Sequence, residues 1–326
     1  MRMTKNQTTV LITGGRGYIG SNLAQVLSDS GFSIHVIDKR EQSPFDVISN
    51  NINYLSFDLA DPDKHKELSE YMKCLPKETI VIHLAADKSI EESISNPEKY
   101  MRNNVQSTIQ LLSAMKSAQI RKLIFASTAA VYGNNYSDIS LTEDSPIDPI
   151  SPYAKSKKIC EDLINDEVSL NVAIIRFFNA AGAINEGLIE SNGLNLFPQI
   201  LQSYTLKKNF EVFGDNYDTP DGTCIRDYVC IDDLISGIQG CFQLLENKTL
   251  GTINLGSGTG HSVMEVLGEF ASFLGPLDVS VVEPREGDAR QVIADISKAK
   301  KTLNWAPSKS LNYIVRSVVA GVPTAR

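Results

Sequence analysis

The stretch "VLITGGRGYIGSNLAQVL", residues 10–27, limits the fold more than any other part of the chain. Its apolar opening predicts a strand that ends at Thr13, and an amphipathic helix follows at once. Between strand and helix stand Gly14, Gly17 and Gly20, spaced three apart. Glycines at these positions let the backbone turn tightly and approach a pyrophosphate at the helix N-terminus. The stretch therefore predicts a dinucleotide-binding unit; the alternative is a glycine-rich turn that holds no ligand.

The next expected strand, "SIHVID", ends in Asp38, eighteen residues beyond Gly20. A carboxylate at this point accepts hydrogen bonds from the adenosine ribose hydroxyls and repels a 2′-phosphate, which favours NAD over NADP. Lys39 and Arg40 follow directly and weaken that preference.

The rest of the first half alternates short apolar runs with helical patterns. Such a pattern indicates a parallel sheet covered on both faces, hence a doubly wound, Rossmann-type α/β fold. We expect a NAD-binding domain over 1–178 and a smaller C-terminal α/β lobe over 179–326, partly interleaved, with a strand near 251–255 returning to the main sheet. The expected strands of the first domain are 8–13, 33–38, 52–57, 79–85, 122–127 and 172–178, and its expected helices are 18–30, 62–74, 97–118 and 153–169.

Polar residues after later strands are further candidates for the dinucleotide site. Asp58 could reach the adenine amino group; equally, Asp58 or Asp61 caps the next helix. Lys88, after the fourth strand, is placed to reach the pyrophosphate or to remain solvated. Asn103 and Asn104 fall inside an expected helix, where asparagine has poor propensity, so one of them should face a polar partner.

The stretch "SPYAKSKK", residues 151–158, combines a helix-start signal with a tyrosine and a lysine four residues apart. Tyr153 and Lys157 then share one helix face, where an ammonium would lower the pKa of a phenol. The same spacing recurs at Tyr204 and Lys208, so spacing alone does not assign a role.

Composition excludes several classes of protein. The formal net charge of -8 argues against broad nucleic-acid binding. No apolar run reaches the roughly 18 residues of a membrane span, and no export signal is recognised, so we expect a cytoplasmic protein with no membrane partner. The five cysteines are odd in number and form no C-x-x-C pair, and the four histidines are scattered. We therefore expect reduced thiols and no metal site.

The motifs together resemble the extended short-chain dehydrogenase/reductase superfamily and, within it, the UDP-glucose (UDP-galactose) 4-epimerases. The stretches that carry the resemblance run in order along nearly the whole chain. They are "TGGRGYIGS", "HLAADKSIEES", "NPEKYMRNNV", "FASTAAVYG", "SPYAKSKK", "RFFNAAGA", "DGTCIRDY", "NLGSGTGHSV" and "PREGD".

The resemblance implies NAD-dependent 4-epimerisation of a UDP-sugar through a transient 4-keto sugar. It implies that Tyr153, Lys157 and Thr128 are catalytic, whereas Tyr204 and Lys208 match nothing and are expected to be structural. It implies cofactor contacts from Gly14, Gly17, Tyr18, Ile19, Gly20, Asp38, Asp58, Leu59, Lys88, Asn103, Ser127, Tyr153 and Lys157. It implies substrate contacts from Asn179, Asn195, Arg226, Tyr228, Arg285, Asp288 and Val292. A homodimer built from helices 97–118 and 153–169 is also expected.

Three features depart from the usual epimerase pattern. The segment 180–194 is short, Phe177 stands where many members carry tyrosine, and Val292 lines the expected sugar pocket, where a bulky aromatic would exclude N-acetylated sugars. UDP-N-acetylhexosamines are therefore possible substrates. The alternatives are a UDP-pentose 4-epimerase, a 4,6-dehydratase, and a non-catalytic NAD-binding regulatory module. Ala129 and Ala130 stand where a dehydratase needs an acid–base pair.

Overall fold

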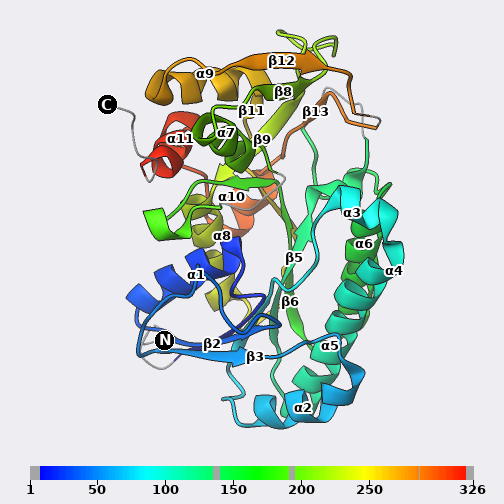
Figure 1. Cartoon of the computed structure of the whole chain (residues 1–326). Coiled ribbons are helices and arrows are strands. Elements are labelled where there is room, and N and C mark those ends of the chain that lie inside the picture. The colour runs from blue at the N-terminus through cyan, green and yellow to red at the C-terminus, as the bar shows by residue number, and fades with distance from the viewer. Residues whose placement is uncertain (1–7, 135–139, 191–194, 286, 321–326) are drawn as a thin grey trace. The chain divides into compact units, whose positions relative to one another are not determined.

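The computed structural model describes residues 8–134, 140–190, 195–285 and 287–320 (Figure 1). The chain divides into two compact units, and each is built from several stretches of sequence. The first unit comprises 1–133, 149–176 and 237–253, and the second comprises 134–148, 177–236 and 254–326. Part of the short segment 180–194, residues 191–194, lies outside the described residues.

The first unit is organised around a seven-stranded parallel sheet with strand order β10-β6-β5-β4-β1-β2-β3. The predicted doubly wound fold is thus confirmed, and the strand at 251–255 lies beside β6 in this sheet. The order reverses between β1 and β4, the point where sheets of this kind bind ligands at the carboxyl ends of their strands. The strands are β1 (Thr9–Thr13), β2 (Ser33–Asp38), β3 (Ile52–Ser56), β4 (Ile80–His83), β5 (Lys122–Thr128), β6 (Asn171–Phe177) and β10 (Gly251–Leu255).

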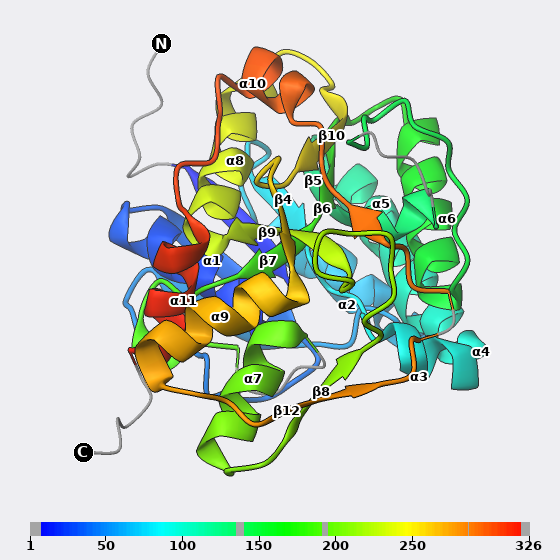
Figure 2. The ribbon, with the colours of Figure 1, turned by 90° about the horizontal axis from the view of Figure 1, so that it is seen from above.

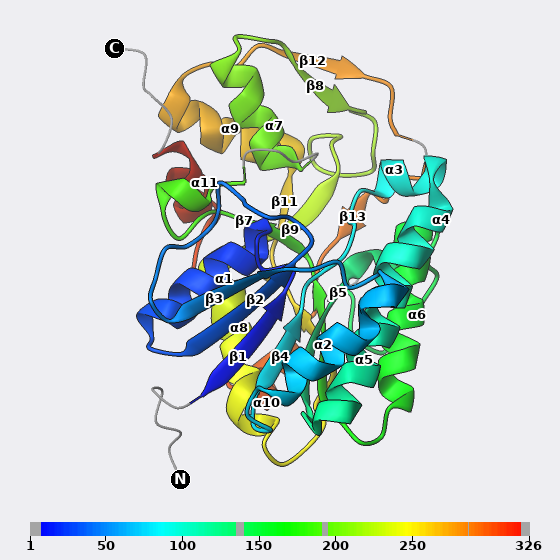
Figure 3. The ribbon, with the colours of Figure 1, turned by 60° about the horizontal axis from the view of Figure 1, so that its bottom comes forward.

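Helices cover both faces of this sheet, as Figure 3 shows for α1 on one face and α2, α5 and α6 on the other. Near-continuous apolar strands require this cover, because both of their faces must be buried. One core cluster joins the sheet to the second group of helices through residues such as Leu68, Met115 and Ile164. The helices are α1 (Tyr18–Asp29), α2 (His65–Lys73), α3 (Ile90–Ser95), α4 (Pro97–Tyr100), α5 (Ser107–Ala118) and α6 (Pro152–Asp166).

The expected single helix over 97–118 is interrupted in the structure. A π-helical turn, Met101–Gln106, separates α4 from α5. Within it the Asn104 side chain is buried and bonds the backbone of Asp87 and the hydroxyl of Ser156. The expectation that one of the two asparagines faces a polar partner is confirmed, and π-turns of this kind are common at functional sites.

The second unit holds two smaller sheets and several helices, seen from above in Figure 2. One sheet has the order β11-β9-β13 with β7 beside β9, and the other pairs β12 with β8. Its core is a cluster in which Phe197, Phe270 and Ile314 join helices to strands. The elements are β7 (Asn179–Ala181), α7 (Leu196–Thr205), β8 (Phe210–Phe213), β9 (Ile225–Cys230), β11 (Gly260–Ser262), α9 (Val263–Leu274), β12 (Val279–Val282), β13 (Gln291–Val292), α10 (Ser297–Leu303) and α11 (Leu311–Val319). Helix α8 (Ile231–Leu244) begins in this unit and ends in the first.

All five cysteines are free thiols, four of them buried. No cluster of His, Cys, Asp and Glu side chains within the described ranges could hold a metal ion. None of the helices described is both long enough and apolar enough to span a bilayer.

Candidate active site

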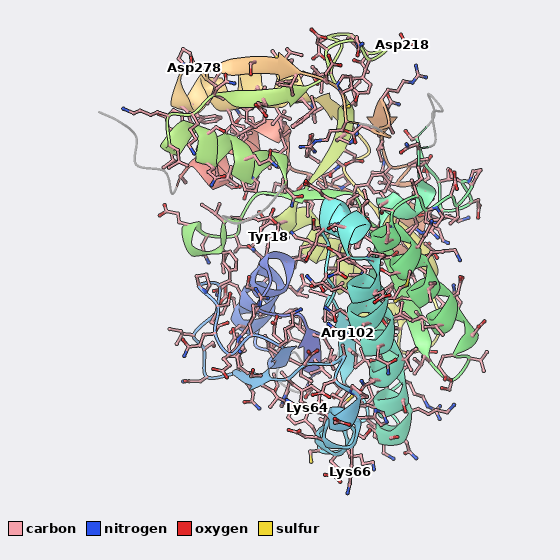
Figure 4. The ribbon with its side chains drawn as sticks, turned by 45° about the vertical axis from the view of Figure 1, so that its right-hand side comes forward. Tyr18, Lys64, Lys66, Arg102, Asp218 and Asp278 are labelled. Carbon is pink, nitrogen blue, oxygen red and sulfur yellow. The ribbon has the colours of Figure 1, made fainter. Side chains whose placement is uncertain are left out.

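The glycine-rich turn adopts a backbone that only glycine accommodates well. Gly14 has a φ of +69°, and its N–H donates to the Ile37 carbonyl at 2.7 Å. A Cβ at Gly14 would lie 2.7 Å from the Ala85 Cα, and one at Gly20 would lie 2.6 Å from the Gly15 Cα. The turn therefore packs backbone against backbone, and it delivers the chain to α1 at Tyr18, which is labelled in Figure 4.

Asp38, at the end of β2, is buried beside this turn. Its Oδ1 accepts from the backbone N–H of Arg40 at 3.1 Å and from Arg40 Nε at 2.9 Å. Its Oδ2 accepts from the backbone N–H of Arg16 at 3.0 Å and from Arg40 Nη2 at 2.8 Å. Burial works against ionisation, but these bonds, led by the Arg40 side chain, leave the pKa of Asp38 lowered. Asp38 is therefore an anion at neutral pH.

The other expected cofactor residues lie in the same unit. Asp61, not Asp58, caps the helical turn that begins at Pro62, since its carboxylate accepts from the N–H of Asp63. Asp58 is exposed and accepts from the Ala60 N–H at 2.9 Å, and Leu59 beside it is buried.

Two more of these residues follow β4 or lie in the π-helical turn. Lys88 is exposed in the segment after β4. Asn103 is half-buried, and its Nδ2 donates to the Asp87 carboxylate. Asp87, in the segment after β4, is thereby hydrogen-bonded to the π-helical turn.

Thr128 and Tyr153 meet at the carboxyl end of β5. Thr128 ends the strand, and its side chain is hydrogen-bonded to the Tyr153 hydroxyl. Tyr153 lies in the first turn of α6, where Ser151 caps the helix by accepting from the Ala154 N–H at 3.1 Å. The sequence-based assignment of a helix start at Ser151 is confirmed, and the cap fixes where Tyr153 points.

Lys157 lies one turn further along α6 and is buried. Its Nζ donates to the Ala126 carbonyl at 2.7 Å and lies 4.7 Å from the centre of the Phe125 ring. Burial lowers the pKa of Lys157 to about 8. A lysine held in this way acts at a fixed place near the end of β5 instead of reaching into solvent.

The expectation that Lys157 acidifies Tyr153 does not hold for the side chains of this structure. Burial raises the pKa of Tyr153, and the hydrogen bond from Thr128 opposes that rise. The physical reason lies with Lys157, whose ammonium is directed at the Ala126 carbonyl and is itself disfavoured by burial.

A buried ion pair supports helix α6, which carries Tyr153 and Lys157. Arg176 on β6 donates from Nη2 to Glu161 Oε2 at 2.7 Å and from Nε to Oε1 at 2.9 Å. The Ser127 hydroxyl donates to the same Oε1 at 2.5 Å. The side chain of Ser127 is thus engaged with Glu161, so a cofactor contact from Ser127 would use its backbone. The sequence did not predict this pair, because the spacing of Glu161 and Arg176 follows no pattern that indicates an ion pair.

The second Tyr–Lys pair does not form a helical pair. Tyr204 lies in the last turn of α7, which ends at Thr205. Lys207 then has a φ of +50°, and Lys208 lies beyond the helix, exposed to solvent. Tyr204 and Lys208 therefore share no helix face.

The second unit holds all seven residues expected to contact substrate. Arg226 on β9 donates from Nη1 to the Ala289 carbonyl at 2.7 Å, and its Nη2 lies 3.4 Å from Asp288 Oδ1. Val292 on β13 is the register partner of Arg226. Arg226, Asp288 and Val292 are therefore neighbours, although they lie up to 66 residues apart in sequence.

The remaining four lie in different settings within that unit. Tyr228 is buried against Phe197, with ring centres 5.4 Å apart. Asn179 donates to the Asp227 carbonyl at 3.2 Å, and Asn195 donates to Glu190 Oε2 at 2.8 Å. The Arg285 guanidinium stacks on the Phe213 ring at 3.8 Å.

Comparison with known proteins identifies the family. The model of the NAD dependent epimerase/dehydratase family matches residues 10–256. The chain belongs to the NAD-dependent epimerase/dehydratase family. A UDP-glucose 4-epimerase from Yersinia pestis is 35% identical over 93% of this chain and 94% of its own length.

Two solved structures of this family share the fold. One is the UDP-glucose 4-epimerase from Stenotrophomonas maltophila with bound NAD and formylated UDP-arabinopyranose, with a TM-score of 0.88, 31% identity, and coverage of 96% of this chain and 97% of the other. The other is the UDP-Glc/GlcNAc 4-epimerase from Campylobacter jejuni, with a TM-score of 0.81, 30% identity, and coverage of 96% and 98%. The protein is thus an epimerase/dehydratase-type enzyme whose cofactor is NAD.

The glycine turn of this epimerase/dehydratase fits a dinucleotide. Side chains at Gly14 or Gly20 would collide with backbone, so the turn is kept bare where a pyrophosphate must approach. Gly17 caps α1 without a side chain, and its own Cβ would meet only the Gly14 carbonyl at 3.2 Å and Arg40 at 3.6 Å. In the expected assignment this turn and the start of α1 hold the pyrophosphate.

Proposed function

We propose that this protein catalyses the NAD-dependent 4-epimerisation of a UDP-sugar. The observation that carries the proposal is the hydrogen-bonded pair of Thr128 and Tyr153, with buried Lys157 one helical turn away, in the unit that also holds the glycine turn. Similarity to UDP-glucose 4-epimerases over almost the whole chain supports the same reaction.

The reaction inverts a secondary alcohol that has no good leaving group. Oxidation at C4 removes the stereocentre, and reduction of the 4-keto sugar from its other face restores it inverted. When bound, NAD supplies a hydride acceptor for C4 and a positive nicotinamide ring whose charge favours a nearby phenolate. Tyr153 takes the proton of the 4-hydroxyl as general base and later returns it.

Thr128 and Lys157 support that proton transfer. Thr128 hydrogen-bonds the Tyr153 hydroxyl and is proposed to contact the sugar 4-hydroxyl as well. Lys157 is fixed by its bond to the Ala126 carbonyl, and its remaining N–H groups would bond the nicotinamide ribose in this proposal. Since burial raises the pKa of Tyr153, formation of the phenolate is tied to cofactor binding in this proposal.

Substrate anchoring is assigned to the second unit. A sugar that must present both faces of C4 to one cofactor has to be held elsewhere, and the UDP moiety is the handle. Arg226 and Arg285 are the cations proposed for the diphosphate, through charge-assisted bonds. Asn179, Asn195, Tyr228 and Asp288 are proposed to contact the nucleotide, and Val292 is proposed to border the sugar.

The sister reaction, 4,6-dehydration, lacks its acid–base pair here. Thr128 is followed by Ala129 and Ala130 in a short 3-10 turn, Ala129–Tyr132. An elimination across C5 and C6 needs a proton donor and acceptor beyond those used at C4. Two methyl groups supply neither, so epimerisation is the favoured reaction.

We also propose a homodimer in the cytoplasm. Exposed isoleucines stand on the helices expected at the interface, Ile109 on α5 and Ile159 on α6. Two more, Ile90 and Ile94, lie on α3, which packs against α6. Five free thiols suit a reducing compartment. Sedimentation of the full chain tests the dimer, and a monomer at micromolar concentration would contradict it.

The function is tested with the purified protein and no added cofactor. Interconversion of UDP-glucose and UDP-galactose is followed by NMR, and UDP-pentoses and UDP-N-acetylhexosamines are run in parallel. Tyr153→Phe should lower kcat by about 10²–10⁴-fold, the usual contribution of a general base, while bound nicotinamide nucleotide is retained. The matched control is Tyr204→Phe, which removes the same hydroxyl from α7 and should leave kcat unchanged.

Two results would contradict the proposal. If Tyr153→Phe kept full turnover, Tyr153 would have no role in the reaction. Bound NAD with no conversion of any UDP-sugar in the panel would instead favour a regulatory NAD-binding protein.

A further inference from the structure

The Asp38 carboxylate is fully occupied by donors from its own chain. A carboxylate offers about four acceptor sites, and Asp38 receives four hydrogen bonds. Two of them come from the Arg40 side chain in a side-on, bidentate pair. While this pair holds, Asp38 has no acceptor site left for the two ribose hydroxyls that such a carboxylate usually binds.

The Arg40 guanidinium lies against the phosphate-binding turn. A Cβ at Gly17 would be 3.6 Å from Arg40 Nη2. Nε and Nη2 each give one hydrogen to Asp38, two of the five N–H groups of a guanidinium. About half of the side chain is exposed, at 46%. The outer edge of the Arg40 guanidinium, which includes Nη1, is therefore available to bind a further anion.

The charges around this pair cancel. Arg16 forms an ion pair with Asp46, Nε to Oδ1 at 3.0 Å, and stacks 4.7 Å from the centre of the Tyr54 ring. Arg16 also donates from Nη1 to the Arg40 carbonyl, which fixes the backbone that presents Arg40. Two arginines thus face two aspartates. The repulsion that a lone carboxylate exerts on a 2′-phosphate is offset here.

We propose that Arg40 is a specificity-determining residue that allows the adenosine-ribose subsite to accept a 2′-phosphate, so that the protein binds NADP as well as NAD. Arginine recognises phosphate in bidentate fashion, and an arginine beside the ribose is the usual partner of the 2′-phosphate. Asp38 and Arg16 hold Arg40 in place for this contact. The inference concerns the cofactor site alone and does not depend on which sugar is converted.

The test measures binding, not turnover. Full-length protein is stripped of bound nucleotide, and the dissociation constants of NAD and NADP are measured by calorimetry. AMP and 2′,5′-ADP serve as probes of the adenosine subsite alone. In wild type, NADP should bind within about tenfold of NAD, a difference of about 1.4 kcal/mol or less. Arg40→Gln should weaken NADP and 2′,5′-ADP by at least about tenfold while changing NAD by less than about threefold.

Lys39→Gln is the matched control. Lys39 is the neighbouring cation, half-exposed and 3.4 Å from Asp87, and its loss should leave the NAD-to-NADP ratio unchanged. Wild-type binding of NADP more than about tenfold weaker than NAD would overturn the proposal, and so would an equal ratio in wild type and Arg40→Gln. If Arg40→Gln binds neither nucleotide, the ratio of the NAD and NADP dissociation constants in wild type still tests the proposal.

Discussion

Glu161 and Arg176 form a buried, bidentate ion pair that joins helix α6 to strand β6. Glu161 lies one turn beyond Lys157 and also accepts from the Ser127 hydroxyl at the end of β5. One carboxylate thus connects the helix that carries Tyr153 and Lys157 to two strands. Because Arg176 is buried as well, each charge depends on the other for compensation.

Replacing Glu161 with glutamine should therefore be costly. The variant removes the charge of the carboxylate that accepts two hydrogen bonds from the buried Arg176 guanidinium, and we expect a loss of about 3–5 kcal/mol in the free energy of unfolding. The measurement is denaturant unfolding. Asp162→Asn, which removes the exposed partner of Lys158 on the same helix, should cost less than about 1 kcal/mol. Equal losses in the two variants would contradict the structural role given to Glu161.

The glycine turn gives a second prediction, because its backbone is packed too closely to admit a Cβ at Gly20. A Cβ at Gly20 would lie 2.6 Å from the Gly15 Cα and 2.7 Å from the Gly14 carbonyl oxygen. Gly20→Ala must shift that backbone, so we expect a loss of about 1–3 kcal/mol in stability, as for other overpacked sites. The shift should also weaken NAD binding, measured by calorimetry.

Gly268 provides the control for that prediction. It lies exposed in the middle of α9, and a Cβ there would meet no atom within 4 Å. Gly268→Ala should therefore stabilise the protein by about 0.5–1 kcal/mol, the difference in helix propensity. A stabilising Gly20→Ala would show that the turn tolerates a side chain.

The sequence was sufficient for the main sheet because its strands are short apolar runs set off by helices. Strand β2 begins and ends where the pattern predicts, and the strand near 251–255 returns beside β6. The π-helical turn was not predicted, since an interruption of one helix by Met101–Gln106 leaves the apolar pattern intact. Its cause is tertiary: Asn104 must reach Asp87 and Ser156, far away in sequence.

For the candidate site, the sequence predicted features that depend on neighbouring residues, such as a helix cap. It did not predict electrostatic effects that depend on residues far apart in the chain. The cap at Ser151 placed Tyr153 and Lys157 on α6, whereas Tyr204 and Lys208, at the same spacing, share no helix. The pKa of Tyr153 was predicted in the wrong direction for this structure, because spacing shows neither burial nor the bond of Lys157 to Ala126.

His83 gives a prediction for pH dependence. It is fully buried at the end of β4, between the Thr13 and Thr108 hydroxyls, and burial lowers its pKa to about 3. Below the unfolded value near 6.5 the unfolded chain takes up a proton that the folded chain does not, so stability falls as pH falls from 6.5 towards 3. Between pH 7 and pH 5 this group should remove about 2 kcal/mol.

The measurement compares denaturant unfolding of wild type and His83→Gln at those two pH values. Glutamine does not titrate, so the variant should lose about 2 kcal/mol less than wild type between pH 7 and pH 5, whatever its stability at pH 7. An identical pH dependence in both proteins would mean that His83 is protonated in the fold.

Val292 gives the final prediction, which concerns the sugar. It is half-buried on β13, in register with Arg226, the proposed diphosphate ligand. If it borders the sugar pocket, its small side chain leaves room for an N-acetyl group, and wild type should convert UDP-N-acetylgalactosamine as well as UDP-galactose. Val292→Tyr should lower kcat/KM for the acetylated sugar by about 10–200-fold, the range in which pocket shape discriminates, and affect UDP-galactose far less. Val281→Tyr, at a half-exposed position on β12, should change neither. A wild type inactive on the acetylated sugar would show that another group closes the pocket.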